Sequence, residues 1–208
     1  MRWVLLIGVP SALALIVLAE PILITLFQYG KLTAHDVAMS ALSLRALSLG
    51  LVAFMLIKVL APGFYAHMDT ATPVKIGITA MVANMVMNLL FSLPLMYLWN
   101  IGHMGLALAT SLAAMLNAGL LLRGLLRAGY YKFQPGWTSY ALRLLLASLS
   151  MVAAILWLAP ELSAWFEWRW PRRVFELGVL CSVGLAVYFA ALWLLGTRLR
   201  HLLAPAQH

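Results

Sequence analysis

The chain has 208 residues, of which 64% are hydrophobic and only 10% are charged, and its mean hydropathy is +0.97. Soluble domains carry about 25% charged residues, so this composition excludes a water-soluble globular protein and predicts an integral membrane protein. The net charge of +8 does not indicate a nucleic-acid partner, because the cations lie at the ends of apolar segments rather than on one polar face.

Six apolar segments follow one another along the chain, each near or above the roughly 20 residues that a helix needs to cross a bilayer. None alternates like a barrel strand, and backbone groups in lipid must be satisfied within the segment, so we expect helices. The predicted spans are Trp3–Phe27, Val37–Tyr65, Val74–Trp99, Met104–Leu126, Tyr140–Ala159 and Val174–Gly196. The predicted fold is an all-α integral membrane protein with a bundle of six transmembrane helices.

Prolines and small residues mark special points in these spans. Pro10 and Pro21 interrupt the first span, and we expect them to kink it. In the polar stretch Lys58–Lys75, Pro62-Gly63 is expected to stop the second helix, and Pro73 to open the third. The span Met104–Leu126 is rich in alanine, serine and glycine, which predicts a buried helix against which its neighbours pack closely.

Cations gather at alternate ends of the predicted spans. One side collects Arg2, Lys75, Arg123, Arg127, Lys132, Arg198 and Arg200, with Asp69 as its only acid. The other side mixes Lys31, Arg169, Arg172 and Arg173 with Glu20, Asp36, Glu161, Glu167 and Glu176. The positive-inside rule therefore predicts that the first side, with both termini of this chain, is cytoplasmic.

The longest link between spans is Arg127–Ser139, which contains two glycines and a proline. It divides the chain into a four-helix part at 1–128, a cytoplasmic linker at 129–139 and a terminal two-helix pair with a cytoplasmic tail at 140–208.

Two cations fall within the second span. Burying a cation at bilayer depth costs roughly 2.5–3.5 kcal/mol, so such a side chain is expected to face protein or a wet cavity. Arg45 lies about 12 Å from the outer end of a helix that starts near Val37, which makes it a candidate for a polar substrate path. Lys58 is a second candidate, although it lies near the inner boundary, where snorkelling also explains a lysine.

Polar side chains also occur in the third and fourth spans. Asn84 and Asn88 are four residues apart and therefore share one helix face, and Thr110 lies on the next helix. Their oxygens either coordinate a hard monovalent cation or hydrogen-bond neighbouring helices, and the sequence leaves both interpretations open. No nucleophile–base pattern, metal-ligand spacing or nucleotide-binding loop appears, so we expect no enzyme active site.

Four segments together resemble the MurJ (MviN) lipid II flippases of the multidrug/oligosaccharidyl-lipid/polysaccharide exporter superfamily. The segments are Leu26–Asp36, Lys58–Lys75, Gly105–Asn117 and Gln134–Trp137, and their order and spacing agree with the family. Such flippases have fourteen transmembrane helices, arranged as two six-helix lobes around a central cavity with two additional helices. The chain resembles helices nine to fourteen, which implies a partial transporter fold whose N-terminal helices are missing.

The resemblance implies transport of undecaprenyl-linked peptidoglycan precursor, lipid II, across the bacterial inner membrane by alternating access. The polar headgroup would pass through the cavity, and the lipid tail would follow a groove formed with the last two helices, Tyr140–Ala159 and Val174–Gly196. Some members bind sodium through an Asn, an Asp one turn later and a Thr on the following helix. Asn84, Asn88 and Thr110 match these positions, except that Asn88 stands in place of the acid.

The expected partners are lipid II or a similar polyprenyl-linked substrate, membrane lipids and the missing helices of the same transporter. Apart from a monovalent cation, no cofactor is expected. Two alternatives stay open from the sequence: a flippase for another polyprenyl-linked oligosaccharide, and a nontransporting membrane scaffold for cell-wall enzymes.

Overall fold

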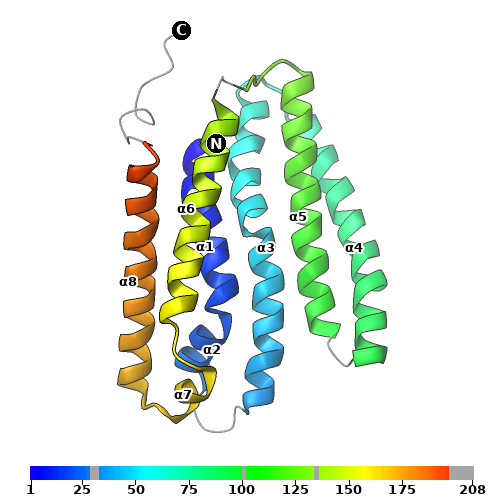
Figure 1. Cartoon of the computed structure of the whole chain (residues 1–208). Coiled ribbons are helices and arrows are strands. Elements are labelled where there is room, and N and C mark those ends of the chain that lie inside the picture. Colours follow the sequence, from blue (N-terminus) through cyan, green and yellow to red (C-terminus); the bar gives the residue numbers. More distant parts are fainter. Residues whose placement is uncertain (29–32, 100–101, 134–135, 197–208) are drawn as a thin grey trace. The chain divides into compact units, whose positions relative to one another are not determined.

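The computed structural model describes residues 1–28, 33–99, 102–133 and 136–196, and every regular element in these ranges is a helix. The helices are α1 (Arg2–Val17), α2 (Ala19–Phe27), α3 (Ala34–Tyr65), α4 (Ala71–Trp99), α5 (Gly102–Arg127), α6 (Trp137–Leu158), α7 (Leu162–Glu167) and α8 (Trp170–Leu194) (Figure 1). Five of them, α3, α4, α5, α6 and α8, are long and apolar enough to cross a membrane. The bent pair of α1 and α2 meets the same criterion when it is taken together, as either a broken sixth span or a re-entrant loop. The predicted all-α membrane fold is confirmed for this part of the chain.

Some of the sequence signals lie outside the described ranges. Three of the cations that predict the orientation lie there: Lys31, Arg198 and Arg200. So do residues 29–32 and 134–135 of the segments that resemble the family. The orientation of the chain in the membrane therefore stays a prediction.

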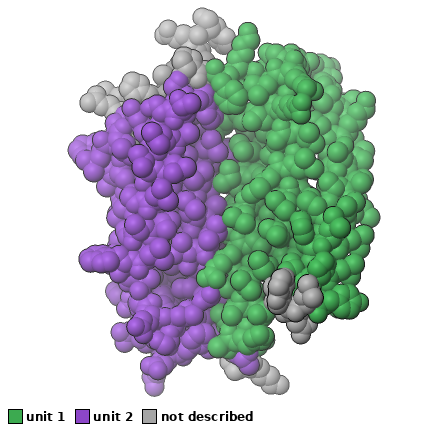
Figure 2. Space-filling view, turned by 45° about the vertical axis from the view of Figure 1, so that its right-hand side comes forward, with its two compact units in different colours: residues 1, 34–133 green, residues 2–33, 134–208 purple. Residues whose placement is uncertain are grey.

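Contacts divide the chain into two compact units, which Figure 2 shows in separate colours. Unit 1 comprises Met1 and residues 34–133, with α3, α4 and α5, and unit 2 comprises residues 2–33 and 134–208, with the other five helices. This grouping differs from the segments 1–128, 129–139 and 140–208 expected from the sequence, because α1 and α2 pack against α6, α7 and α8. The expected segments concern the lobes of a longer transporter and stay a prediction.

In unit 1, α5 lies between α3 and α4 and contacts both along its length. Its buried positions are mostly small: Gly105, Ala107, Ala109, Ser111, Ala113, Ala114 and Ala118. Small side chains allow close helix approach, which matters in lipid because no water-driven force pulls helices together. The prediction that this segment is a buried packing helix is confirmed.

At Gly50, α3 lies too close to α5 to admit a side chain. A Cβ atom added there would lie 2.8 Å from the Cα atom of Ser111. The Ser111 hydroxyl donates a hydrogen bond of 2.6 Å to the Ala46 carbonyl, one turn earlier on α3. The glycine thus creates the space, and the serine joins the two helices with a polar contact.

The hairpin between α3 and α4 differs from the sequence expectation. α3 does not stop at Pro62-Gly63 but continues to Tyr65. It ends in a Schellman arrangement, in which the Asp69 amide donates to the Phe64 carbonyl and the Met68 amide to the Tyr65 carbonyl. Met68 occupies the left-handed position with φ 60°. Proline was expected to end the helix, but the left-handed residue six positions later does so.

Asp69 then prepares the start of α4, which begins at Ala71 rather than at Pro73. Its carboxylate accepts a hydrogen bond of 3.0 Å from the Thr72 amide, in the manner of a helix cap. Hydrogen bonds from the side chain and the backbone of Thr72 lower the pKa of Asp69 below its usual value. The one acid on this side of the chain therefore has a local structural role.

In unit 2, α6 packs against both α8 and α1, and α2 packs against α8 and α7. The first apolar segment breaks at Leu18, where α1 and α2 meet at a bend of 71°. Pro21 lies in the first turn of α2 and cannot donate to the Val17 carbonyl, so the helical ladder is interrupted there. The kink expected at Pro21 is therefore a break between two helices.

Candidate functional site

A polar groove runs between the three helices of unit 1. It has a volume of about 440 Å³, and its walls come from α3, α4 and α5. Most lining residues are apolar or small, but Asn84, Thr110 and Asn117 contribute polar groups. The structure thus brings two of the three predicted cation ligands, Asn84 and Thr110, to one groove.

The third predicted ligand, Asn88, is joined to this groove through Asn84. The Asn88 amide donates a hydrogen bond of 2.6 Å to Asn84 Oδ1, as the spacing of one helical turn allows. The Asn88 side-chain oxygen is buried and has no hydrogen-bond partner. An unsatisfied buried acceptor costs about 1–3 kcal/mol, so this oxygen is an available ligand atom.

The donor set has the chemistry of a weak monovalent-cation site. Thr110 directs its hydroxyl proton to the Leu106 carbonyl at 2.8 Å, which leaves its oxygen lone pairs free to accept. The amide oxygens of Asn84 and Asn88 are neutral, and the described residues hold no cluster of three His, Cys, Asp or Glu side chains. Oxygen ligands without a carboxylate fit sodium, at the cost of the charge that an acid would supply.

The two cations predicted for a substrate path lie far apart on α3. Arg45 is half-buried, and Lys58 is exposed. They are 13 residues apart, a rise of about 20 Å along the helix. Neither lines the polar groove, and neither lines the two apolar grooves, one between α3 and α5 and one between α1, α6 and α8. The structure therefore does not gather them into one site.

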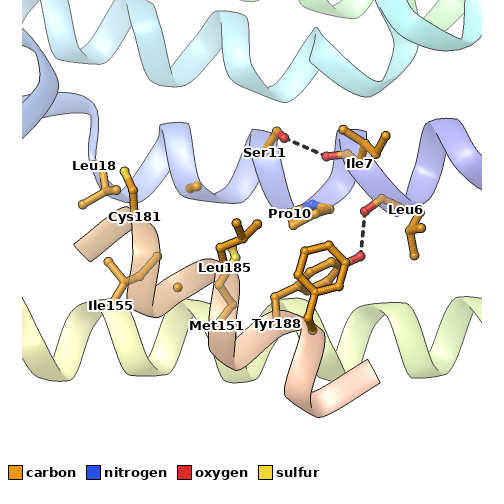
Figure 3. A pocket seen from close by; sticks show the side chains of 13 residues that line it. Leu6, Ile7, Pro10, Ser11, Leu18, Met151, Ile155, Cys181, Leu185 and Tyr188 are labelled. Carbon is orange, nitrogen blue, oxygen red and sulfur yellow. Dashed lines mark hydrogen bonds between the residues drawn. The ribbon is translucent and has the colours of Figure 1, made fainter. Parts of the chain in front are cut away.

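An apolar groove lies between α1, α6 and α8 in unit 2 (Figure 3). Its volume is about 290 Å³, just below the 300–1,000 Å³ common for ligand pockets. Its walls consist almost entirely of aliphatic and aromatic side chains: Leu6, Ile7, Pro10, Ser11, Ala14, Leu18, Met151, Ile155, Cys181, Gly184, Leu185, Tyr188 and Phe189. The groove has room for part of a hydrocarbon chain and lacks the groups that would hold a polar ligand.

Arg173 holds the elements at one end of this unit together. Only 7% of its surface is exposed, and its guanidinium donates to the carbonyls of Ile24 at 3.3 Å, Gln28 at 3.4 Å and Phe166 at 3.1 Å. Two of these carbonyls end α2, where the helix dipole places partial negative charge. Arg173 thereby fixes the end of the bent segment against α7 and α8.

Sequence reasoning missed the structural part played by Arg173 and Tyr188. Arg173 was counted as one of several loop cations, and the structure instead buries it at the start of α8. Tyr188 lies unmarked in an apolar segment, yet its side chain is 2% exposed and its hydroxyl bonds the Leu6 carbonyl at 2.6 Å. Pro10 was the available signal, because a proline has no amide hydrogen to donate to the carbonyl four residues earlier, that of Leu6.

Comparisons with known proteins agree on one family. A family model described as "Lipid II flippase MurJ" matches residues 1–176. A probable lipid II flippase MurJ of Vibrio cholerae is 44% identical over 206 residues, covering 99% of this chain and 38% of the relative. One of Haemophilus influenzae is 46% identical over 202 residues, covering 97% and 38%.

A solved structure named "Lipid II flippase MurJ, inward closed conformation" has the same fold, with a TM-score of 0.72. It is 24% identical, and the match covers 90% of this chain and 35% of that one. The chain therefore spans less than two fifths of the length of the relatives it matches. Together with its long apolar helices, the family match makes it a multi-pass membrane protein. The chain belongs to the MurJ lipid II flippase family.

Proposed function

We propose that this chain forms the C-terminal part of a flippase that moves lipid II, an undecaprenyl-pyrophosphate-linked peptidoglycan precursor, across the bacterial inner membrane. The observation that carries the proposal is the 44% identity to the Vibrio cholerae relative over 99% of the chain. That relative is named as a probable lipid II flippase, and the match covers nearly the whole chain rather than one motif. The activity requires the other helices of the transporter as partners.

The apolar groove between α1, α6 and α8 is the proposed path of the polyprenyl tail. Supporting it are the hydrocarbon character of the walls and the position of α6 and α8 as the last two long helices described. A polyprenyl chain needs apolar surface and offers no hydrogen bonds, which matches this lining. The groove holds a portion of the tail, and the rest would lie in lipid.

Arg45 is the proposed contact for the anionic headgroup. α3 starts three residues earlier than the sequence indicated, so Arg45 lies about 16 Å along the helix from Ala34, deep within an apolar segment. A guanidinium at such depth is matched to a pyrophosphate by charge and by bidentate geometry. Lys58, exposed and near the hairpin, is proposed to meet the headgroup only as it enters.

Asn84, Asn88 and Thr110 are the proposed ligands of a sodium ion that couples transport. The free oxygen of Asn88 and the shared groove of Asn84 and Thr110 support this assignment. The ion would supply a charge that stabilises one arrangement of α4 and α5. We also propose the orientation with the hairpin at His67–Thr70 in the cytoplasm, because of the surrounding cations.

The test is a chimera in which this chain replaces the 206 matched residues of the Vibrio cholerae relative, expressed in cells depleted of their own flippase. We expect growth, and lipid II that an impermeant reagent can label at the outer leaflet. The substitution Arg45→Ala should reduce both signals without lowering membrane abundance. Lys58→Ala, on the same helix, removes only the proposed contact at entry and should reduce both signals less than Arg45→Ala does.

The proposal fails if the chimera reaches normal abundance in the membrane and lipid II still accumulates inside. Accumulation of a different polyprenyl-linked oligosaccharide in the depleted cells, relieved by the chimera, would assign another substrate to the same path. Both results are read from the extracted lipids, so they are separable from general growth defects.

A further inference from the structure

A proline interrupts the backbone hydrogen bonding of α1 beside the apolar groove. Pro10 lies within α1 and has no amide hydrogen, so the Leu6 carbonyl four residues earlier loses its helical donor. In a membrane helix such a carbonyl must find another partner, because lipid offers none and an unsatisfied group costs several kcal/mol. The requirement is stricter here, since the turn lines a groove with apolar walls.

The missing donor comes from another helix. The Tyr188 hydroxyl, on α8, donates to the Leu6 carbonyl at 2.6 Å, and the side chain is 2% exposed (Figure 3). The next carbonyl of the same turn, that of Ile7, accepts a bond of 2.7 Å from the Ser11 hydroxyl. Both carbonyls at the proline turn therefore have side-chain donors, and one of them ties α1 to α8.

We infer that Tyr188 is a positioning residue of the groove, which clasps α8 to the carbonyl that Pro10 exposes on α1. The clasp has two effects. It fixes the distance between α1 and α8, which form two walls of the groove. It also keeps the Leu6 carbonyl hydrogen-bonded where a hydrocarbon chain would lie against it. A phenylalanine would fill the same space but would leave the carbonyl bare. The assignment of that hydrocarbon as a polyprenyl tail rests on the proposed function; the clasp itself does not.

The pairing of Tyr188 with Pro10 predicts a specific dependence between two substitutions. Tyr188→Phe removes the hydroxyl while leaving the ring. Pro10→Ala restores a backbone amide that donates to the Leu6 carbonyl from within α1. Tyr188→Phe should therefore be costly when residue 10 is proline and much less costly when it is alanine. Simple packing of the ring predicts equal effects in the two backgrounds.

The experiment compares the unchanged chain, the two single variants and the double variant, each in the same detergent. Thermal unfolding gives the first readout: in the Pro10→Ala background, Tyr188→Phe should lower the midpoint at most about half as much as in the unchanged background. The second readout is the rate at which a lipophilic maleimide modifies a cysteine introduced by Ile155→Cys, in chains that also carry Cys181→Ser. Ile155 lines the groove and is 1% exposed, so a reagent reaches it only when the walls separate. Cys181, the chain's one cysteine, also lines the groove but is already exposed.

Loss of the clasp should raise that rate about fivefold, the factor that a net hydrogen bond of about 1 kcal/mol gives. Tyr140→Phe is the matched control. The Tyr140 hydroxyl also donates to an α1 carbonyl, that of Arg2, at 2.8 Å. That carbonyl lies four residues before Leu6, which has an amide hydrogen, so Tyr140→Phe should show no dependence on residue 10.

Equal effects of Tyr188→Phe in the two backgrounds would overturn the inference, as would an unchanged modification rate at residue 155 when residue 10 is proline. If Tyr188→Phe alone does not fold, the double variant decides: recovery supports the clasp and persistent misfolding refutes it. Neither readout involves transport. A failure of the proposed function would therefore leave these results intact, and a failed clasp would leave the chimera result intact.

Discussion

Arg173 offers the sharpest test of how unit 2 is held together. Methionine replaces the unbranched apolar stem of Arg173 but has no guanidinium. The substitution therefore removes the three hydrogen bonds to the carbonyls of Ile24, Gln28 and Phe166. A hydrogen bond from a charged group contributes about 1.5–3 kcal/mol. The three distances of 3.1–3.4 Å are long, so we take the lower part of that range.

The loss should therefore be about 3–4 kcal/mol of the free energy of unfolding, once partial rehydration of the carbonyls is allowed for. For a chain of this length each kcal/mol shifts the unfolding midpoint by about 2–4 °C, so Arg173→Met should lower it by about 6–16 °C. Arg173→Lys keeps the charge but not the planar fork, and we expect an intermediate loss. Tryptophan fluorescence in detergent reports this directly, because Trp165 on neighbouring α7 is buried.

Arg172→Met is the control for this measurement. The Arg172 side chain is 61% exposed, stacks on the Trp168 ring at 4.4 Å and forms a 4.0 Å ion pair with Glu176. Exposed pairs of this kind contribute about 0–1 kcal/mol, so the midpoint should move little. If Arg173→Met costs no more than Arg172→Met, the three carbonyl bonds do not hold α2 in place and the reasoning is refuted.

Three further predictions concern unit 1. Gly50→Ala forces a Cβ to within 2.8 Å of the Ser111 backbone and should cost about 1–3 kcal/mol in thermal unfolding, whereas Gly119→Ala, with open space around it, should be tolerated. Met68→Gly relieves a left-handed residue and should raise stability by about 1 kcal/mol, while Met68→Ala, which keeps a Cβ, should change it little. Asn88→Asp adds a charge beside the Asn84 oxygen and should strengthen sodium binding at least about tenfold by calorimetry; unchanged binding would argue against the proposed ligands.

The helical spans were predictable because hydropathy and length are local properties. The segment expected at Tyr140–Ala159 corresponds to α6 at Trp137–Leu158, and that at Val174–Gly196 to α8 at Trp170–Leu194. Termini shift by a few residues, since caps and turns decide where a helix ends. α7 was missed because six residues carry too little periodicity to be recognised.

The features that depend on distant parts of the chain could not be read from the sequence. Pro21 indicated a kink, but the 71° bend is set by what α2 packs against, including the Arg173 guanidinium 149 residues away from Ile24. Pro62 indicated a helix end, but α3 continues through Pro62 to Tyr65, because the other backbone hydrogen bonds hold the helix together. The hydrogen bond from the Asn88 side chain to Asn84 was foreseeable from their spacing, whereas the groove shared by Asn84 and Thr110 requires three packed helices.

Photocrosslinking tests most directly whether the tail of lipid II lies in the apolar groove between α1, α6 and α8. Cys181, carrying a benzophenone maleimide, is irradiated in membranes that hold the Vibrio cholerae chimera and radiolabelled lipid II, after other cysteines are removed. We predict a lipid II adduct at Cys181 well above that from a Cys181→Ser, Trp157→Cys variant, in which the probe occupies an 87% exposed position outside the groove. Equal labelling at the two positions would place the tail in bulk lipid and contradict the proposed path of the tail through the groove.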